Sequence, residues 1–234
     1  MLGCLAAAGF ILGAMIMLPA RSMAQAASHP VRVRAKMDGF DIAPKAGKSP
    51  NQVGGASRGL GNVVLYAPNV GKTYTLHPTF FWRADDPKGE YLFQVSLASS
   101  PDSPLLQTKV VGGSLKYPRS APALTPGTNY IWSVQPSIDM LGGPATAGFV
   151  VIDGAERSSI AAALAHADSA PDPALARAKV YMDKRLWFDA VAAYTKLINQ
   201  HPDQSDLYEA RSEIYEQLPQ TTVLAEADAA KAHP

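Results

Sequence analysis

The stretch from Ala178 to Pro202 constrains the fold of this chain more than any other. Small and aromatic residues recur through it at helical spacing and a proline closes it: Ala178, Tyr181, Trp187, Ala190, Tyr194 and Pro202. Small residues let two antiparallel helices approach closely, and aromatic rings fill the space between them. The pattern therefore predicts one helix from about Ala174 to Asp183 and a second from about Trp187 to Gln200.

This spacing resembles that of a tetratricopeptide-type helical hairpin, a repeat whose stacked helices form surfaces that bind other proteins. A second hairpin is predicted after it, with a helix capped by Ser205 or Asp206 and an alanine-rich helix that starts near Thr222. It matches the repeat poorly, so we expect it to act as a terminal cap. A further helix upstream is predicted to be capped by Ser158 or Ser159.

From residue 61 to residue 153 the sequence has the period of strands. Tyr91, Phe93, Val95 and Leu97 alternate with other residues, as do Tyr130, Trp132 and Val134. The segments 85–89 and 124–127 are predicted turns, in which proline sets φ and glycine adopts a positive φ. Short strands separated by such turns, with no helix between them, predict an antiparallel β-sandwich. The phrases Pro-x-Phe-x-Trp and Leu-x-Pro-Gly also resemble those of immunoglobulin-like and fibronectin-like modules.

The predicted fold class is therefore α+β, with four segments in order. Residues 1–26 are a signal peptide or N-terminal anchor, 27–60 a flexible basic linker, 61–153 the β-sandwich and 158–232 the helical domain. The linker is rich in Pro, Gly, Lys and Ser and has little periodicity, which is typical of an unstructured tether.

The first segment has the composition of a secretory signal. Its apolar run from Leu5 to Leu18 is too short to span a bilayer comfortably. The small-x-small pattern at Ala24-Gln25-Ala26 is the kind that signal peptidase cuts, so the mature chain would start near Ala27. No charged side chain precedes the apolar run, and an uncleaved anchor is the alternative. We expect the protein to be exported, either periplasmic or secreted, with inner-membrane attachment only through this segment.

Composition excludes several classes of function. The net charge of the 234 residues is +1, which gives no overall field to attract nucleic acid or an anionic membrane. Cys4 is the single cysteine and would leave with the signal peptide. The mature chain would then have no disulfide, no zinc-thiolate site and no cysteine nucleophile.

Two short motifs have the letters of catalytic or phosphate-binding loops. Gly55-Ala56-Ser57-Arg58-Gly59 fits the G-x-S-x-G pattern, which needs a strand before the serine and a helix after it. Here a polar linker precedes Ser57 and a strand follows, so a serine hydrolase is kept only as a second alternative. Gly71-Lys72-Thr73 is similar to the end of a phosphate loop, but an extended segment follows it. We therefore predict Lys72 to be a turn lysine.

The other polar candidates are typical of ordinary surface. Asp85 and Asp86 are adjacent in a turn, so we expect them to point in different directions and not to form an acid/base couple. No two histidines have i, i+4 spacing, so we expect no metal site. These histidines are His29, His77, His166, His201 and His233.

The aromatic residues of the strands could form a ligand platform, but at this spacing they are more typical of a sandwich core. They are Phe80, Trp82, Tyr91, Phe93, Tyr130 and Trp132.

From about residue 52 to residue 224 the chain resembles a family of exported bacterial proteins, domain of unknown function number 928. The resemblance rests on blocks in a fixed order: residues 54–59, Ala67-Pro68, residues 77–82, residues 122–132 and residues 186–190. The resemblance implies this layout of the chain and no particular activity.

The sequence thus predicts a non-catalytic adaptor or scaffold of the cell envelope that binds other proteins. We expect no catalytic, cofactor-binding or metal-binding residues, and the sequence assigns no binding residues. The first alternative is a module that binds a small ligand or a glycan on its sheet aromatics. That alternative predicts that Trp82 or Trp132 is exposed.

Overall fold

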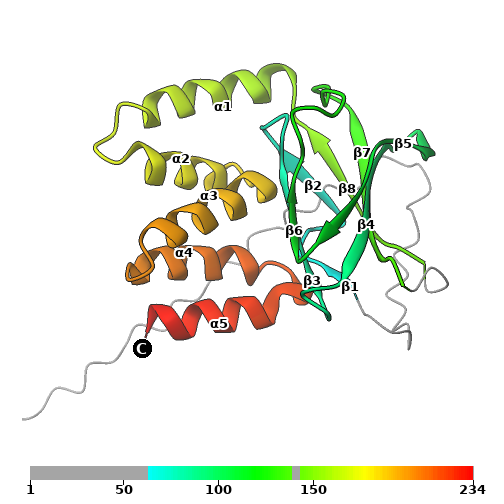
Figure 1. The fold of residues 1–234 in the computed structure, drawn as a ribbon. Coiled ribbons are helices and arrows are strands. Elements are labelled where there is room, and N and C mark those ends of the chain that lie inside the picture. Colours follow the sequence, from blue (N-terminus) through cyan, green and yellow to red (C-terminus); the bar gives the residue numbers. More distant parts are fainter. Residues whose placement is uncertain (1–62, 139–142, 234) are drawn as a thin grey trace, which may run out of the picture. The chain divides into compact units, whose positions relative to one another are not determined.

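The computed structural model describes residues 63–138 and 143–233 (Figure 1). In this part of the chain the fold is mixed α+β, with eight strands in two sheets followed by five α-helices and one short 3-10 helix. The predicted signal peptide (1–26) and basic linker (27–60) lie outside the described residues. So do Cys4, His29 and Ser57.

The first sheet has three strands in the order β1-β3-β6. These strands are β1 (Val63–Leu65), β3 (Thr79–Ala84) and β6 (Ser114–Lys116), and both pairings are antiparallel.

The second sheet has five strands in the order β2-β8-β7-β4-β5. Its strands are β2 (Val70–Thr73), β8 (Ala145–Val151), β7 (Asn129–Pro136), β4 (Glu90–Leu97) and β5 (Ser100–Val111). The pair β2 and β8 is parallel, so the prediction of a wholly antiparallel arrangement is wrong at this edge. Parallel neighbours need a long connection rather than a hairpin, and here strands β3 to β7 lie between them in the chain.

The two sheets contact each other through aromatic rings, as the alternating pattern predicts. The ring of Phe80 in β3 lies 5.2 Å from that of Phe93, 4.8 Å from that of Trp132 and 5.3 Å from that of Phe149. All six of the aromatic residues singled out from the sequence are at most 2% exposed. The prediction that these aromatic residues form the core between the sheets is therefore confirmed.

The two predicted turns close in different ways. Gly127 has a φ of 77°, as expected of a glycine that ends a Pro-Gly turn. Gly89 is not among the residues with positive φ, so that part of the prediction is wrong. Its turn closes through Asp86, whose carbonyl oxygen accepts the N–H of Gly89 at 3.0 Å and whose carboxylate accepts the N–H of Lys88 at 2.9 Å.

The helices follow the strands and stack in chain order along one side of the sheets (Figure 1). They are α1 (Gly154–Ala167), α2 (Pro173–Asp183), α3 (Trp187–Gln200), α4 (Ser205–Tyr215), η1 (Pro219–Thr221) and α5 (Thr222–Ala232). The two helices predicted around Ala178 and Ala190 form as expected, and both alanines are fully buried.

Two predicted helix starts are wrong. Helix α1 begins at Gly154, with Asp153 rather than Ser158 or Ser159 at the cap position. The hydroxyl of Ser158 donates instead to the carbonyl of Gly154 at 3.1 Å, a bond that a serine inside a helix can make. Helix α4 is preceded by Gln204, not by Ser205 or Asp206.

The strands and the helices share one hydrophobic core. Buried residues from both sheets and from helices α2 to α5 belong to a single cluster, and Phe188 of α3 lies within it. A smaller cluster joins Ile152, Ile160, Leu164 and Leu186. The predicted boundary between 153 and 158 thus marks the change from strands to helices without separating two cores. Over the described residues, no helix combines the length and the apolar character needed to cross a membrane.

Candidate functional site

Strand β2 and the loop after it are where the helices meet the sheets. Lys72 lies in the strand, so its prediction as a turn lysine is wrong, and its Nζ is 2.8 Å from Glu156 Oε1 of α1. Gly71 lies against Phe188, and a Cβ at Gly71 would come 2.6 Å from Cε2 of that ring. The close approach of Phe188 of α3 therefore explains the glycine in the short Val-Gly-Lys-Thr segment, and no phosphate site is needed to explain it.

Phe188 in the first turn of helix α3 packs against aromatic rings of both sheets. Its ring is 1% exposed and lies 5.4 Å from Phe80, 5.7 Å from Phe149 and 6.5 Å from Trp132, with edge-to-face geometry in each pair. Edge-to-face ring pairs add to the stabilisation that burial alone gives. The contact makes the first turn of α3 part of the sheet core.

Asp189 follows Phe188 and is also buried. Its Oδ2 accepts the N–H of Tyr74 at 2.8 Å, and its Oδ1 accepts the N–H of Thr75 at 3.0 Å. Burial raises the pKa of the Asp189 carboxyl from 3.8 to about 6, although the N–H groups of Tyr74 and Thr75 act in the opposite direction. The carboxylate thus caps the loop that leaves β2.

Further polar contacts hold the same segment. Arg157 of α1 donates to the carbonyl of Tyr74 at 2.7 Å and stacks over the Tyr74 ring at 4.3 Å. Trp187 Nε1 donates to the carbonyl of Tyr66 at 3.0 Å, and Gln220 Nε2 donates to the carbonyl of Ala67 at 2.7 Å. We call residues 66–75 together with these partners the junction. The partners are Glu156, Arg157, Trp187, Phe188, Asp189 and Gln220.

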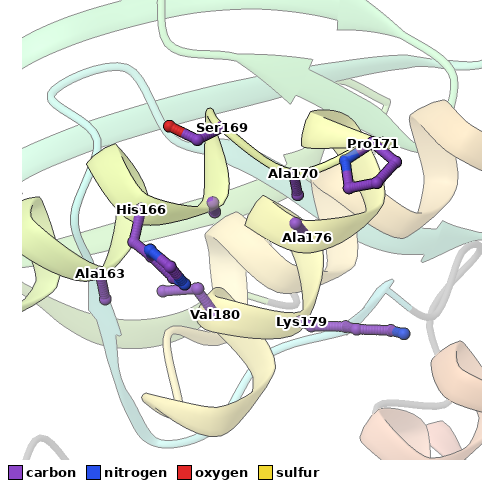
Figure 2. A pocket seen from close by; sticks show the side chains of 9 residues that line it. Ala163, His166, Ser169, Ala170, Pro171, Ala176, Lys179 and Val180 are labelled. Atoms are coloured by element: carbon purple, nitrogen blue, oxygen red, sulfur yellow. The ribbon is translucent and has the colours of Figure 1, made fainter.

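A groove lies between α1 and α2, away from the junction (Figure 2). Its volume is about 470 Å³. It is lined by short side chains, with two basic residues among them: Ala163, His166, Ala167, Ser169, Ala170, Pro171, Ala176, Lys179 and Val180. We call it the α1–α2 groove.

The groove forms because alanines cannot fill the space between the two helices. Near the sheets, the gap is closed by larger side chains such as Ile160, Leu164 and Leu186. Beyond them Ala163 and Ala167 of α1 and Ala176 of α2 line the space, up to the connection at residues 168–172. The hairpin is braced there by Arg177, whose Nη1 lies 2.8 Å and 3.0 Å from the two carboxylate oxygens of Asp168.

The polar groups of the groove come from both of its helices. In Figure 2 the hydroxyl of Ser169 and the ring of His166 extend in opposite directions. Nucleophilic catalysis would need these two groups within hydrogen-bond reach of each other. His166 from α1 and Lys179 from α2 instead place two basic groups on opposite walls, and no carboxylate belongs to the lining.

The remaining candidates from the sequence do not converge. His77 is half-buried with its ring 6.2 Å from that of Tyr117, while His201 and His233 follow the last residues of α3 and α5. In the part of the chain that the structure describes, no three possible metal ligands form a group.

The two adjacent aspartates have different partners. Asp85 lies 3.8 Å from Nε of Arg83, whereas the Asp86 carboxylate accepts a backbone N–H within its own turn. This agrees with the prediction that they are turn residues pointing in different directions.

A small-ligand or glycan module would need exposed aromatic rings on its sheet, and the two sheet tryptophans are not exposed. Trp82 is 2% exposed and Trp132 is fully buried. The expectation that one of them lies at the surface is wrong, because both pack between the sheets.

No sequence motif points to Asp189 or to the groove. A signal for Asp189 does exist, because it is an acidic residue set directly between an aromatic and a small residue in the first turn of a predicted helix. A signal for the groove is the density of alanines on both sides of Pro171. Small residues mark a close helix contact or an unfilled space, and only the packing distinguishes the two.

Comparison with known proteins places most of the chain in one family. A family model described as Domain of Unknown Function (DUF928) matches residues 54–227, which include both sheets and nearly all of the helices. No curated protein matches the chain.

Proposed function

We propose, for a chain that belongs to the family described as Domain of Unknown Function (DUF928), that it is a non-catalytic adaptor of the cell envelope that binds other proteins. The observation that carries this proposal is an open groove built on a braced scaffold. The junction holds the helices against the sheets, and the α1–α2 groove is an open, largely apolar surface with His166 and Lys179 in its lining. Binding surfaces that are held rigid lose little entropy when a partner docks.

The strand part of this adaptor is proposed to be an immunoglobulin-like or fibronectin-like sandwich. A tyrosine in the predicted Leu-x-Pro-Gly region supports this, because the hydroxyl of Tyr130 accepts the N–H of Thr125 at 2.7 Å. A tyrosine hydroxyl bonded to backbone a few residues upstream is a recurrent corner in such sandwiches.

The helical part is proposed to be tetratricopeptide-like. Its support is the hairpin of α2 and α3, in which Ala178 and Ala190 are fully buried and Tyr194 is 1% exposed. Small residues at a helix contact and a ring beside them are what the repeat pattern requires.

Export is proposed from the apolar run at residues 5–18 and the Ala24-Gln25-Ala26 pattern. Cell fractionation followed by amino-terminal sequencing tests it. A mature terminus near Ala27 in the periplasm or medium is expected. An intact amino terminus in the membrane fraction would favour the anchor, and a cytoplasmic location would contradict export.

Chemical cross-linking in the native envelope, followed by affinity capture of the full chain, tests the adaptor role. A specific protein partner recovered in constant proportion is expected. The proposal fails if no partner is recovered while the pure protein turns over a substrate. Labelling by a serine-reactive phosphonate that Ser57→Ala abolishes would in that case favour the hydrolase.

A further inference from the structure

We propose that the free edge of strand β5 pairs with the same edge of a second copy of this chain, in an antiparallel arrangement centred on Thr108. The pairing would join the five-stranded sheets of the two copies into one continuous sheet. Because both copies use the same edge, the interface closes at two copies and does not propagate. This inference goes beyond the adaptor function, since it concerns how the chain associates with itself.

Strand β5 (Ser100–Val111) is the last strand of its sheet. Its neighbour is β4, and in the part of the chain that the structure describes no other strand pairs with it. Within the same described part, residues 105–111 form no hydrogen bond to the backbone of a loop or helix. An edge strand of this kind presents a row of N–H and C=O groups that can pair with another strand.

Only the first half of this edge carries features that block pairing. Pro101 and Pro104 have no N–H to donate, and the pairing with β4 skips Leu105, which forms a β-bulge. Prolines and bulges are the usual devices by which proteins protect an edge strand. From Leu106 to Val111 the pairing with β4 is regular and contains neither device.

The regular half of the edge is also close to neutral. Its one charged residue is Lys109, whose Nζ lies 2.8 Å from Glu90 Oε1 of β4. A lysine on an edge strand usually repels an approaching strand, and this ion pair reduces that repulsion. Val111 at the end of the strand is 65% exposed, so a second strand would cover aliphatic surface there.

The geometry of antiparallel strands restricts where the two-fold axis between identical strands can lie. Along a strand, successive residues direct their side chains to opposite faces and their backbone groups to opposite edges. Residues that lie opposite each other in a pair must agree in both respects. When the two strands are identical, the axis must therefore pass through a residue and not between two residues.

An axis through Thr108 gives the best match of side chains. It places Leu106 opposite Val110 of the second copy, so that aliphatic groups face each other. It places Gln107 opposite Lys109, which keeps the two lysines apart, and it places threonine opposite threonine. Cross-strand pairs of these kinds stabilise antiparallel sheets.

The other axes in the regular half fit less well. An axis through Lys109 would set two lysines directly opposite each other, which is destabilising. Axes through Leu106 or Gln107 would extend the pairing across the bulge to Pro104, which has no N–H. An axis through Val110 would run past the end of the strand. The sequence of the edge thus selects one register for pairing with its own copy.

Sedimentation equilibrium of the purified full chain measures this association. Two short strands bury little surface, so the dimer should be weak and the runs extend to the millimolar range. The test variants are Gln107→Glu and Gln107→Lys, which would face Lys109 of the second copy with opposite and with equal charge. Gln107 is exposed, so neither change alters the core. The matched controls are Gln200→Glu and Gln200→Lys, at the exposed last residue of α3.

The expected result is an equilibrium between monomer and dimer. Gln107→Lys should weaken the dimer at least about fivefold and Gln107→Glu should tighten it at least about threefold, because the altered pair occurs twice about the axis. Salt should reduce both effects. The two Gln200 variants should change the dissociation constant by less than about twofold.

Cysteine variants test the register directly, in a chain that also carries Cys4→Ser. A mixture of Gln107→Cys and Lys109→Cys chains should form a disulfide between the two variants on oxidation, because these positions lie opposite each other. Neither variant should cross-link to its own kind. In that case the two cysteines would be diagonal neighbours about 7–8 Å apart, whereas a disulfide needs a Cβ separation of about 3.5–4.5 Å. Both positions are exposed, so folding does not limit this test.

A chain that stays monomeric at every concentration would overturn the proposal. So would a dimer that responds equally to both Gln107 variants, and so would disulfides that form within one variant and not between the two. If the pure chain is monomeric while Gln107→Cys cross-links to another protein in the native envelope, a strand of that protein is the occupant and the second copy is excluded. A dimer without any captured envelope partner would leave this inference standing and sink the adaptor function.

Discussion

The junction and the α1–α2 groove are both built by helices, yet they use their side chains in opposite ways. At the junction, Phe188 fills the space between the sheets and Asp189 satisfies two backbone N–H groups of the segment after β2. In the groove, alanines leave about 470 Å³ unfilled and Lys179 forms no ion pair among the described residues. One region is filled by its contacts, and the other leaves space that the proposed function assigns to a partner.

The difference shows how the helices that form the groove are held in place by contacts elsewhere in the fold. Helix α3 is fixed by aromatic and polar contacts at its first turn, and α2 is packed against α3 through Ala178 and Ala190. Helix α1 is tied to β2 through the Glu156–Lys72 ion pair and to Tyr74, directly after the strand, through Arg157. The open ends of α1 and α2 therefore extend from segments that these contacts join to the rest of the fold. If this comparison is correct, substitutions at the junction should change stability and substitutions in the groove should change binding.

The largest expected effect is that of Phe188→Ala. Removing this ring leaves a cavity between the sheets, and such truncations typically lower the free energy of unfolding by about 3–5 kcal/mol. Urea denaturation followed by tryptophan fluorescence measures the change. Lys196→Ala, an exposed position on the same helix, serves as the control and should stay close to wild type. A loss under about 1 kcal/mol for Phe188→Ala would mean that α3 does not share the sheet core.

The next effect concerns pH and Asp189. Its folded-state pKa of about 6 lies above the ordinary value of 3.8, so the folded protein keeps a proton that the unfolded chain releases between these values. The contribution of Asp189 to stability is therefore greatest below about pH 4 and falls by about 3 kcal/mol in all as the pH rises through about 6.

Comparison of wild type with Asp189→Asn isolates this contribution. The difference between their free energies of unfolding should change from about pH 4 until the pH has risen through about 6, and should level off about one unit above that. Asp203→Asn, at an exposed position, should follow the wild-type curve. Parallel curves for wild type and Asp189→Asn would show that the carboxyl does not titrate with a raised pKa.

A smaller effect is expected at the exposed edge of the junction. Glu156→Gln removes the ion pair with Lys72. The side chain of Glu156 is 46% exposed and that of Lys72 is 29% exposed. Exposed pairs of this kind contribute about 0–1 kcal/mol, and salt weakens them. Thermal unfolding at low and high ionic strength checks this. The difference in melting temperature between wild type and variant is expected to narrow in high salt. A large difference that does not depend on salt would show that the pair contributes as a buried contact does.

The smallest effect on stability is expected in the groove. Ala176→Phe adds a ring to unfilled space at the surface of α2, so the free energy of unfolding should stay within about 0.5 kcal/mol of wild type. Urea denaturation measures it beside Ala174→Phe, at an exposed position on the same helix outside the lining. A large loss would show that the groove is closed in solution, and the contrast between the two regions would then disappear.

The elements themselves could be predicted from the sequence with good accuracy. Alternation at Tyr91, Phe93 and Val95 predicts a buried face of β4, and the spacing of Ala178 and Ala190 predicts two packed helices. These local patterns succeed because burial on one face of a strand or helix imposes a fixed period. Strand β2 escapes prediction because its four residues show no alternation, and its pairing with β8 depends on a strand far away in the chain.

The sequence by itself determined the periods of strands and helices, the aromatic core and the family to which the chain belongs. Only the tertiary structure decided that Gly71 makes room for Phe188, that Asp189 is buried with a raised pKa, and that alanines on α1 and α2 leave a groove. The physical reason is that periodicity reports which face of an element is apolar. What fills the space opposite that face, and whether a charge beside it finds a partner, depends on residues that are distant in sequence.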